Sequence, residues 1–223
     1  MSITTDGPPQ QAGQEIRNPF FARLYHHVLQ RDTSAKDLAC RRELLADLAG
    51  TVVEVGPGNG PNFAVYGEGV ERVIAVEPEP YLRKKAAAAA ARAAVEIQVV
   101  AGDGEHLPLA DGSVDAVVLA LVLCSVPDQA RTLSEARRVL RPGGEVRVYE
   151  HVVAERPVPR ALQRAAQATF WPRALGNCHP ARDTLQALRD AGFDTADVHR
   201  FVMQVAPVEP PMPYILGRSV AQP

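Results

Sequence analysis

The sequence has few cysteines and no large excess of charge of either sign. Its three cysteines, Cys40, Cys124 and Cys178, are widely spaced, odd in number and contain no CxxC pair, so they form neither a disulfide framework nor a structural zinc signature. The 24 basic and 26 acidic residues give a formal net charge of −2. Because nucleic-acid binding normally needs a basic face, we expect a small-molecule partner and no nucleic-acid partner.

A long apolar run is also missing. The most apolar stretch, 114–126, is interrupted by an aspartate and a serine and is too short to cross a bilayer. Residues 1–14 are polar and lack the apolar region of a signal peptide. We therefore expect a flexible tail over 1–17 and a single domain over 18–223, in a cytoplasmic protein with no membrane partner. The sequence leaves the oligomeric state open between monomer and homodimer.

What the sequence does contain is an alternation of helix-like and strand-like segments. Apolar residues at helical spacing predict helices at 18–31, 35–48, 81–94, 129–140 and 182–191. Runs rich in β-branched residues predict strands at 51–55, 72–76, 96–101, 114–121 and 145–152, and two closing strands at 193–205 and 214–220. Strands that alternate with helices indicate an α/β fold with a parallel sheet and right-handed crossovers.

The first predicted strand runs into the glycine-rich loop Glu54-Val55-Gly56-Pro57-Gly58-Asn59-Gly60. Glycines let the backbone turn sharply and approach a ligand closely, and a helix start after the loop would offer free N–H groups. A dinucleotide fingerprint, G-x-G-x-x-G, would need glycine at position 61, which is Pro61, so a nicotinamide oxidoreductase is excluded. Taken alone, the loop is also compatible with a tight structural turn between a strand and a helix.

Polar residues follow the next three strands as well. Glu77, in Val76-Glu77-Pro78, can accept hydrogen bonds from both hydroxyls of a ribose. The third strand ends in 102–108, where a carboxylate can accept a proton from an adenine amino group, and the fourth ends in 121–128. Ligands of open parallel sheets bind outside the carboxyl ends of the strands, so these loops indicate one nucleotide-type site.

Together these segments resemble the successive motifs of class I S-adenosylmethionine-dependent methyltransferases, over nearly the whole chain from residue 18. The matching segments are 54–60, 76–78, 102–108, 111–115 and 138–144. The resemblance implies a Rossmann-like fold with a seven-stranded sheet in the order 3-2-1-4-5-7-6, strand 7 antiparallel. It also implies S-adenosylmethionine as methyl donor and S-adenosylhomocysteine as product.

The same resemblance implies which residues surround the cofactor. The glycine loop would face the methionine portion, Glu77 the ribose and 103–105 the adenine. The expected cofactor-binding residues are Tyr25, Glu54, Gly56, Gly58, Gly60, Asn62, Glu77, Pro78, Asp103, Gly104, Glu105, Leu121 and Cys124. In these terms the domain divides into N-terminal helices over the site (18–50), a cofactor-binding core (51–152) and a substrate-capping segment with the closing strands (153–223).

A closer resemblance is to small actinobacterial methyltransferases and to the alkyl-thiol methyltransferases of the mammalian methyltransferase-like group. The run shared with the mammalian group comprises 121–126, 150–152, Trp171, Cys178 and Arg182. It implies a thiol of a metabolite as acceptor. Methylation of oxygen or nitrogen on a phenolic or amine natural product stays open, as does a catalytically silent subunit that binds adenosylmethionine.

The catalytic candidates lie near the end of the fifth predicted strand and beyond it. His151 is the best candidate base because imidazole titrates near neutral pH, although a structural histidine is the alternative. Side chains alternate along a strand, so only one of Glu150 and His151 should face the pocket. Cys178 and His179 lie in the capping segment as further candidates; with His151 they match no zinc signature, and no metal is expected.

Large apolar side chains are the candidates for the wall of the acceptor site. Phe170 and Trp171 lie in the capping segment, and Phe20 lies in the first predicted helix. We expect these rings to line the acceptor, with packing in the core as the alternative for the capping pair.

Overall fold

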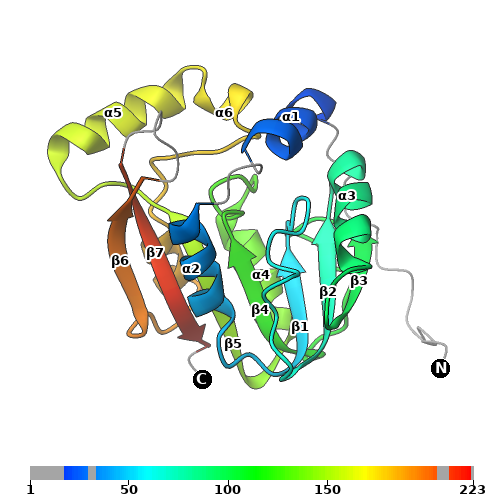
Figure 1. Ribbon diagram of the computed structural model, residues 1–223. Helices are drawn as coiled ribbons and strands as arrows, with labels where there is room; N and C mark the ends of the chain where they lie inside the picture. The colour runs from blue at the N-terminus through cyan, green and yellow to red at the C-terminus, as the bar shows by residue number, and fades with distance from the viewer. Residues whose placement is uncertain (1–17, 30–33, 205–210, 222–223) are drawn as a thin grey trace.

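The computed structural model has one seven-stranded sheet with the order β3-β2-β1-β4-β5-β7-β6 (Figure 1). It describes residues 18–29, 34–204 and 211–221. The first five strands pair in parallel, and β7 is antiparallel to both β5 and β6. The predicted fold class and strand order are therefore confirmed. The expected N-terminal tail, 1–17, lies outside the described residues.

The strands are β1 Gly50–Val55, β2 Val70–Glu77, β3 Glu96–Ala101, β4 Val114–Ala120, β5 Leu140–His151, β6 Val198–Met203 and β7 Met212–Val220. The helices are α1 Pro19–Leu24, the π-helix η1 Tyr25–Leu29, α2 Ala35–Leu45, α3 Pro80–Ala90, α4 Gln129–Val139, α5 Pro157–Ala168, α6 Trp171–Ala174 and α7 Thr184–Asp190. None of the helices in the described ranges combines the length and the apolar character that crossing a bilayer requires.

Two boundaries differ from the sequence pattern in a way that matters for the site. The helix predicted over 18–31 divides into α1 and the wider η1, a form often found at functional sites. The last parallel strand begins at Leu140 rather than 145, because Leu140 pairs with Val114 before a shift in register.

The central strands β1 and β4 are buried on both faces because their side chains alternate in direction and helices pack on each face. In β1, Val53 and Val55 pack with α4 and α7 on one face, whereas Val52 packs with α2 and α3 on the other. The N-terminal α1 and the helices α5 and α6 lie above the ends of the parallel strands (Figure 1). We call residues 157–183 the cap segment. This arrangement leaves the carboxyl ends of β1, β2, β4 and β5 as the place for a ligand.

A buried ion pair attaches α2 to the sheet. Arg41 Nε donates to Asp37 Oδ2 at 2.7 Å, and Arg41 Nη1 donates to Asn62 Oδ1 at 2.8 Å. The Tyr149 hydroxyl of β5 donates to Asp37 Oδ1 at 3.0 Å. Asn62 in turn donates to Glu54 Oε1 at 2.8 Å, so the network reaches from α2 to the glycine loop.

Replacing Arg41 by alanine should therefore be strongly destabilising. The Arg41→Ala variant leaves Asp37 as an uncompensated buried charge, which typically costs about 3–5 kcal/mol of unfolding free energy. Arg42, the next residue on α2, is exposed, and Arg42→Ala should change the unfolding free energy by less than about 0.5 kcal/mol. Urea unfolding of the two variants measures the difference. Equal losses would contradict a structural role for the buried pair.

Candidate functional site

The glycine-rich loop after β1 is closed in by two other segments. Gly56 and Gly58 both have a φ of 62°. A Cβ at Gly56 would lie 2.6 Å from Val122 Cγ2, and a Cβ at Gly58 would lie 2.9 Å from Tyr25 Cε1. Side chains at these two positions would therefore fill the space between the loop and its neighbours. The bare backbone and the ring of Tyr25 beside it fit a site for the methionine portion of the cofactor.

The helix start expected after this loop does not form. Residues 61–65 make successive turns, with Phe63 N–H donating to Gly60 O and Val65 N–H donating to Asn62 O. Because these turns do not continue into a helix, there is no helix N-terminus to bind an anion, and that prediction is wrong. The loop is held instead by Gly58 N–H, which donates to Glu77 Oε2 at 2.8 Å.

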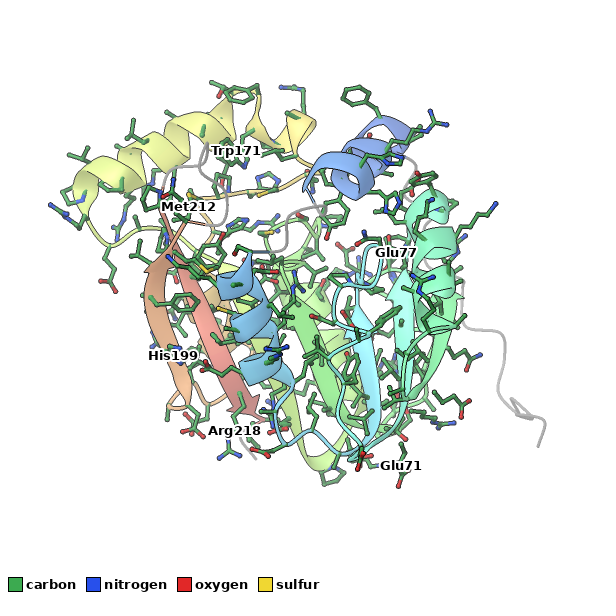
Figure 2. All side chains as sticks on the ribbon, in the orientation of Figure 1. Glu71, Glu77, Trp171, His199, Met212 and Arg218 are labelled. Carbon is green, nitrogen blue, oxygen red and sulfur yellow. The ribbon has the colours of Figure 1, made fainter. Side chains whose placement is uncertain are left out.

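Glu77 ends β2 beside this loop and is buried (Figure 2). Its second oxygen, Oε1, accepts a hydrogen bond from Glu79 N–H at 2.9 Å. Burial raises the pKa of Glu77 to about 7, against the opposing effect of the two backbone N–H donors. Each carboxylate oxygen can accept more than one hydrogen bond, so Glu77 keeps capacity for the ribose hydroxyls, as the sequence predicts.

Glu54 and Asn62 lie beneath the loop and have internal partners. Glu54 accepts hydrogen bonds from Asn62 Nδ2 and from the Tyr66 hydroxyl at 2.8 and 2.7 Å. The amide oxygen of Asn62 accepts from Arg41, so both of its polar atoms are used. Burial raises the pKa of Glu54. These two residues are placed to support the loop from below, and their direct contact with a cofactor stays a prediction.

The loop expected to face the adenine is closed by its own side chains. Asp103 Oδ1 accepts from Glu105 N–H and His106 N–H, both at 2.9 Å. Glu105 Oε1 accepts from Asp128 N–H at 2.8 Å, which connects this loop to the start of α4. Gly104 packs so closely that an added Cβ would lie 3.0 Å from Val55 Cγ1. The loop thus lies over the end of β1, next to the glycine loop.

The residues after β4, which we call the β4 loop (121–128), are fixed by Glu150 of β5. Glu150 Oε1 accepts hydrogen bonds from Val122 N–H at 2.6 Å and Leu123 N–H at 2.7 Å, and Oε2 lies 3.4 Å from Cys124 N. Burial raises the pKa of Glu150 well above its usual range. The carboxyl group accepts from three successive backbone N–H groups, which places Glu150 to position the β4 loop. A catalytic role for Glu150 stays a prediction.

The cap segment is tied to the same loop. Arg182 Nη1 donates to the carbonyl oxygens of Leu123 and Val126, both at 2.6 Å, and His179 N–H donates to Cys124 O at 2.8 Å. Arg182 belongs to the run shared with the thiol methyltransferases, but this contact cannot be read from the sequence, because its partners are backbone groups more than fifty residues away. The cap segment and the β4 loop therefore form one unit over the strand ends.

Three side chains meet where this unit covers β5. His151 Nε2 lies 3.1 Å from Cys178 Sγ, and these two atoms and Cys124 Sγ lie within 4.8 Å of one another. We call Cys124, His151 and Cys178 the sulfur–imidazole cluster. A hydrogen bond between the two thiols lowers the pKa of Cys124 well below its usual range and raises the pKa of Cys178. The structure thus brings together His151, Cys178 and Cys124, as part of the predicted site.

His179 and the aromatic residues predicted to form an apolar wall are not members of the sulfur–imidazole cluster. The His179 ring lies next to Asn177, with its Nε2 at 3.2 Å from Asn177 Oδ1, and takes no part in the cluster. Trp171 belongs to the cap segment, and its Nε1 is buried (Figure 2). Phe20, in α1, and Phe170, in the cap segment, are 77% and 64% exposed, so neither packs in the core. Their contact with an acceptor stays a prediction.

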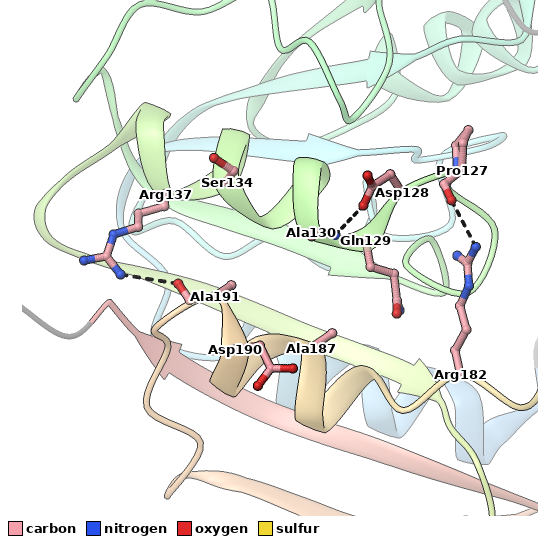
Figure 3. Close-up of a pocket in the computed structure, with 10 residues that line it drawn as sticks. All are labelled: Pro127, Asp128, Gln129, Ala130, Ser134, Arg137, Arg182, Ala187, Asp190 and Ala191. Atoms are coloured by element: carbon pink, nitrogen blue, oxygen red, sulfur yellow. Dashed lines mark hydrogen bonds between the residues drawn. The ribbon is translucent and has the colours of Figure 1, made fainter.

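A separate cleft of about 680 Å³ lies between α4 and α7 (Figure 3). Its lining includes Asp128, Arg137 and Asp190, and Arg182 closes one end. Asp128 caps α4 and Arg137 donates to the carbonyl oxygen of Ala191, so these polar groups serve the local fold. The cleft is on the face of the sheet rather than at the strand ends, and it contains no member of the sulfur–imidazole cluster. We therefore place the functional site at the strand ends.

Comparisons with known proteins agree with this geometry. A family model described as a methyltransferase domain matches residues 53–148. The human thiol S-methyltransferase TMT1B is 33% identical over 86% of this chain and 83% of its own length. The human thiol S-methyltransferase TMT1A is 36% identical over 78% of this chain and 74% of its own length. A putative methyltransferase structure from Bacillus halodurans shares the fold, with a TM-score of 0.68 at 20% identity, covering 83% of this chain and 98% of that one.

The pKa of Glu77 predicts a pH dependence of cofactor binding. Ribose hydroxyls donate to the ionised carboxylate, so binding favours the state that dominates above pH 7. The dissociation constant for S-adenosylhomocysteine should rise as the pH falls below 7, by up to about tenfold per pH unit, and level off above about pH 8. Calorimetry across this range measures it. Glu77→Gln should bind more weakly with a flat profile, and a flat profile in the wild type would contradict the assignment.

The role of Glu150 can be separated from catalysis. In Glu150→Gln an amide NH₂ group faces backbone N–H donors, so the β4 loop should loosen at a cost of about 1–3 kcal/mol in unfolding free energy. The KM for the cofactor should rise together with this loss, because Val122 of that loop packs against Gly56. The exposed Glu71 of β2 provides the control, Glu71→Gln. A Glu150→Gln protein with wild-type stability and KM and a lower kcat would show a catalytic role instead.

Proposed function

Because the chain belongs to the class I S-adenosylmethionine-dependent methyltransferases, we propose that it methylates the sulfur of a small-molecule thiol. The observation that carries this proposal is the sulfur–imidazole cluster beneath the cap segment, at the ends of β4 and β5. The two human relatives are named thiol S-methyltransferases, which supports the same acceptor class.

S-adenosylmethionine supplies an activated methyl group on a sulfonium. The protein must then hold the acceptor in line with that group and exclude water, since such a displacement needs little covalent help. The bare backbone at Gly56 and Gly58 and the buried carboxylate of Glu77 suit the methionine and ribose portions. Tyr25 of η1 covers the loop at Gly58 and shields it from solvent.

A thiol suits the acceptor side better than a phenol or an amine. A thiol such as that of free cysteine, with a pKa near 8.5, is already partly ionised at neutral pH, and the thiolate is the nucleophile. Its acceptor site would be formed by the sulfur–imidazole cluster, with Trp171 above it and the β4 loop beside it. Soft sulfur and imidazole groups suit an acceptor that is itself a thiol. The cluster consists of two cysteines and one histidine, so it contains no carboxylate that could bind an amine cation.

A screen with labelled S-adenosylmethionine tests the acceptor. The full chain is incubated with matched small alkyl thiols, phenols and amines, and the products are identified by mass spectrometry. The kcat/KM should be highest for thiols, by at least about tenfold, because the other acceptors need a base to remove a less acidic proton. Good transfer to a phenol or an amine with none to any thiol would contradict the proposal.

A pair of glycine variants shows whether transfer depends on the cofactor loop. In Gly56→Ala the new methyl group would lie 2.6 Å from Val122. We expect transfer to fall by at least about a hundredfold, since a small misplacement of the cofactor costs that much. Gly143 has a φ of 81° but open space around it, so Gly143→Ala carries similar backbone strain and should keep most of its activity. Equal losses in the two variants would contradict the assignment of the loop.

A further inference from the structure

The three members of the sulfur–imidazole cluster come from three separate parts of the fold. Cys124 lies in the β4 loop, His151 ends β5 and Cys178 lies in the cap segment. Their donor atoms nevertheless lie within 4.8 Å of one another, and both cysteines are free thiols. The resemblance and the comparisons assign no role to this convergence.

Two thiols and one imidazole form a donor set that zinc prefers. Catalytic zinc sites have three protein ligands, and Cys₂His is one of the known sets, with the fourth tetrahedral position left for a ligand. With Zn–S near 2.3 Å and Zn–N near 2.0 Å, tetrahedral donors lie about 3.5–3.8 Å apart. The observed 3.1 Å between His151 Nε2 and Cys178 Sγ, and the 4.8 Å limit for the set, bracket that spacing. Small side-chain rotations would place the donors around one ion.

The surroundings of the cluster also suit a metal ion. Glu150 fixes the backbone at Cys124, and His179 N–H ties Cys124 O to the cap segment. The buried Trp171 Nε1 lies close to Cys178 and has no hydrogen-bond partner of normal geometry among the described residues. Groups around a metal site that hold its ligands are typical of functional metal centres.

The charges of the proposed site would balance. With a divalent ion bound, two thiolates and one neutral imidazole would give a site with no net charge.

We propose that Cys124, His151 and Cys178 bind a zinc ion, and that its fourth position takes the acceptor thiol. This inference rests on the proposed thiol methylation and deepens it. It replaces the expectation of no metal, which relied on the wide spacing of the donors. Because 27 residues separate His151 from Cys178, no short zinc motif exists in the sequence.

The chemistry of the acceptor follows from this position. A thiol that binds the zinc releases its proton to solvent, because a coordinated thiol is ionised near neutral pH. Its sulfur then forms a bond to the methyl carbon, and the bond between that carbon and the cofactor sulfur breaks. The electron pair of the broken bond stays on the cofactor sulfur, which gives S-adenosylhomocysteine. The thioether product carries no charge and binds zinc weakly, so it leaves. His151 then acts as a ligand rather than as a base.

Metal content and cobalt spectra test the site without cofactor or substrate. Untagged full-length protein, purified under reducing conditions, should contain about one zinc ion per chain. Cobalt in its place should give the sulfur-to-cobalt charge-transfer band and the intense visible bands of a tetrahedral site. Cys124→Ser and Cys178→Ser should lose these bands, whereas Cys40→Ser, on α2, should keep them. The wild-type spectrum tests the site even if a variant does not fold. A wild-type cobalt spectrum without the sulfur-to-cobalt band overturns the inference.

Methyl transfer with and without metal separates this inference from the proposed function. Removal of zinc by a chelator should lower kcat/KM for a thiol by at least about tenfold, and added zinc should restore it. Transfer to a thiol at an unchanged rate after complete metal removal overturns the zinc inference and leaves the proposed function intact. Zinc-loaded protein that methylates no thiol overturns the proposed function instead.

Discussion

The arrangement of the site depends on one buried carboxylate, that of Glu150. It accepts hydrogen bonds from successive N–H groups of the β4 loop, which has turned sharply at Leu121, a residue with a φ of 57°. Such backbone strain persists only where the surroundings hold it. With the loop fixed, Val122 lies against Gly56 and Cys124 lies against Cys178. One interaction therefore holds the β4 loop both against the glycine loop and against the sulfur–imidazole cluster.

Three buried carboxyl groups have different structural roles at the carboxyl ends of the parallel strands. Glu54 supports the glycine loop from below, Glu77 holds its backbone at Gly58, and Glu150 holds the β4 loop. Burial raises the pKa of all three, and hydrogen-bond donors offset part of that cost. Among these three, only Glu77 is placed beside the space for the ribose. Most of the hydrogen bonds of these three carboxyl groups thus hold loops at the strand ends in place.

The sequence predicted the sheet well, because the strands depend on local patterns. The residues expected on the cofactor side were also chosen from local patterns. Three features can be recognised in the sequence without knowledge of the tertiary contacts. They are the strand runs, the spacing of two between Gly56, Gly58 and Gly60, and the position of Glu77 at a strand end. The acceptor side depends on long-range packing. Nothing local shows that Glu150 points at the β4 loop, that Phe170 is exposed, or that Cys178 meets His151. The missing helix after Gly60 shows the same limit, since only the fold reveals that those turns stop.

A crystal structure with S-adenosylhomocysteine and a small thiol bound together tests the central claim most directly. The account predicts the thiol sulfur beside Cys124, His151 and Cys178, on a metal ion, with the cofactor sulfur facing it from the glycine loop. A thiol bound instead in the cleft between α4 and α7, with the sulfur–imidazole cluster holding neither thiol nor metal, would contradict it.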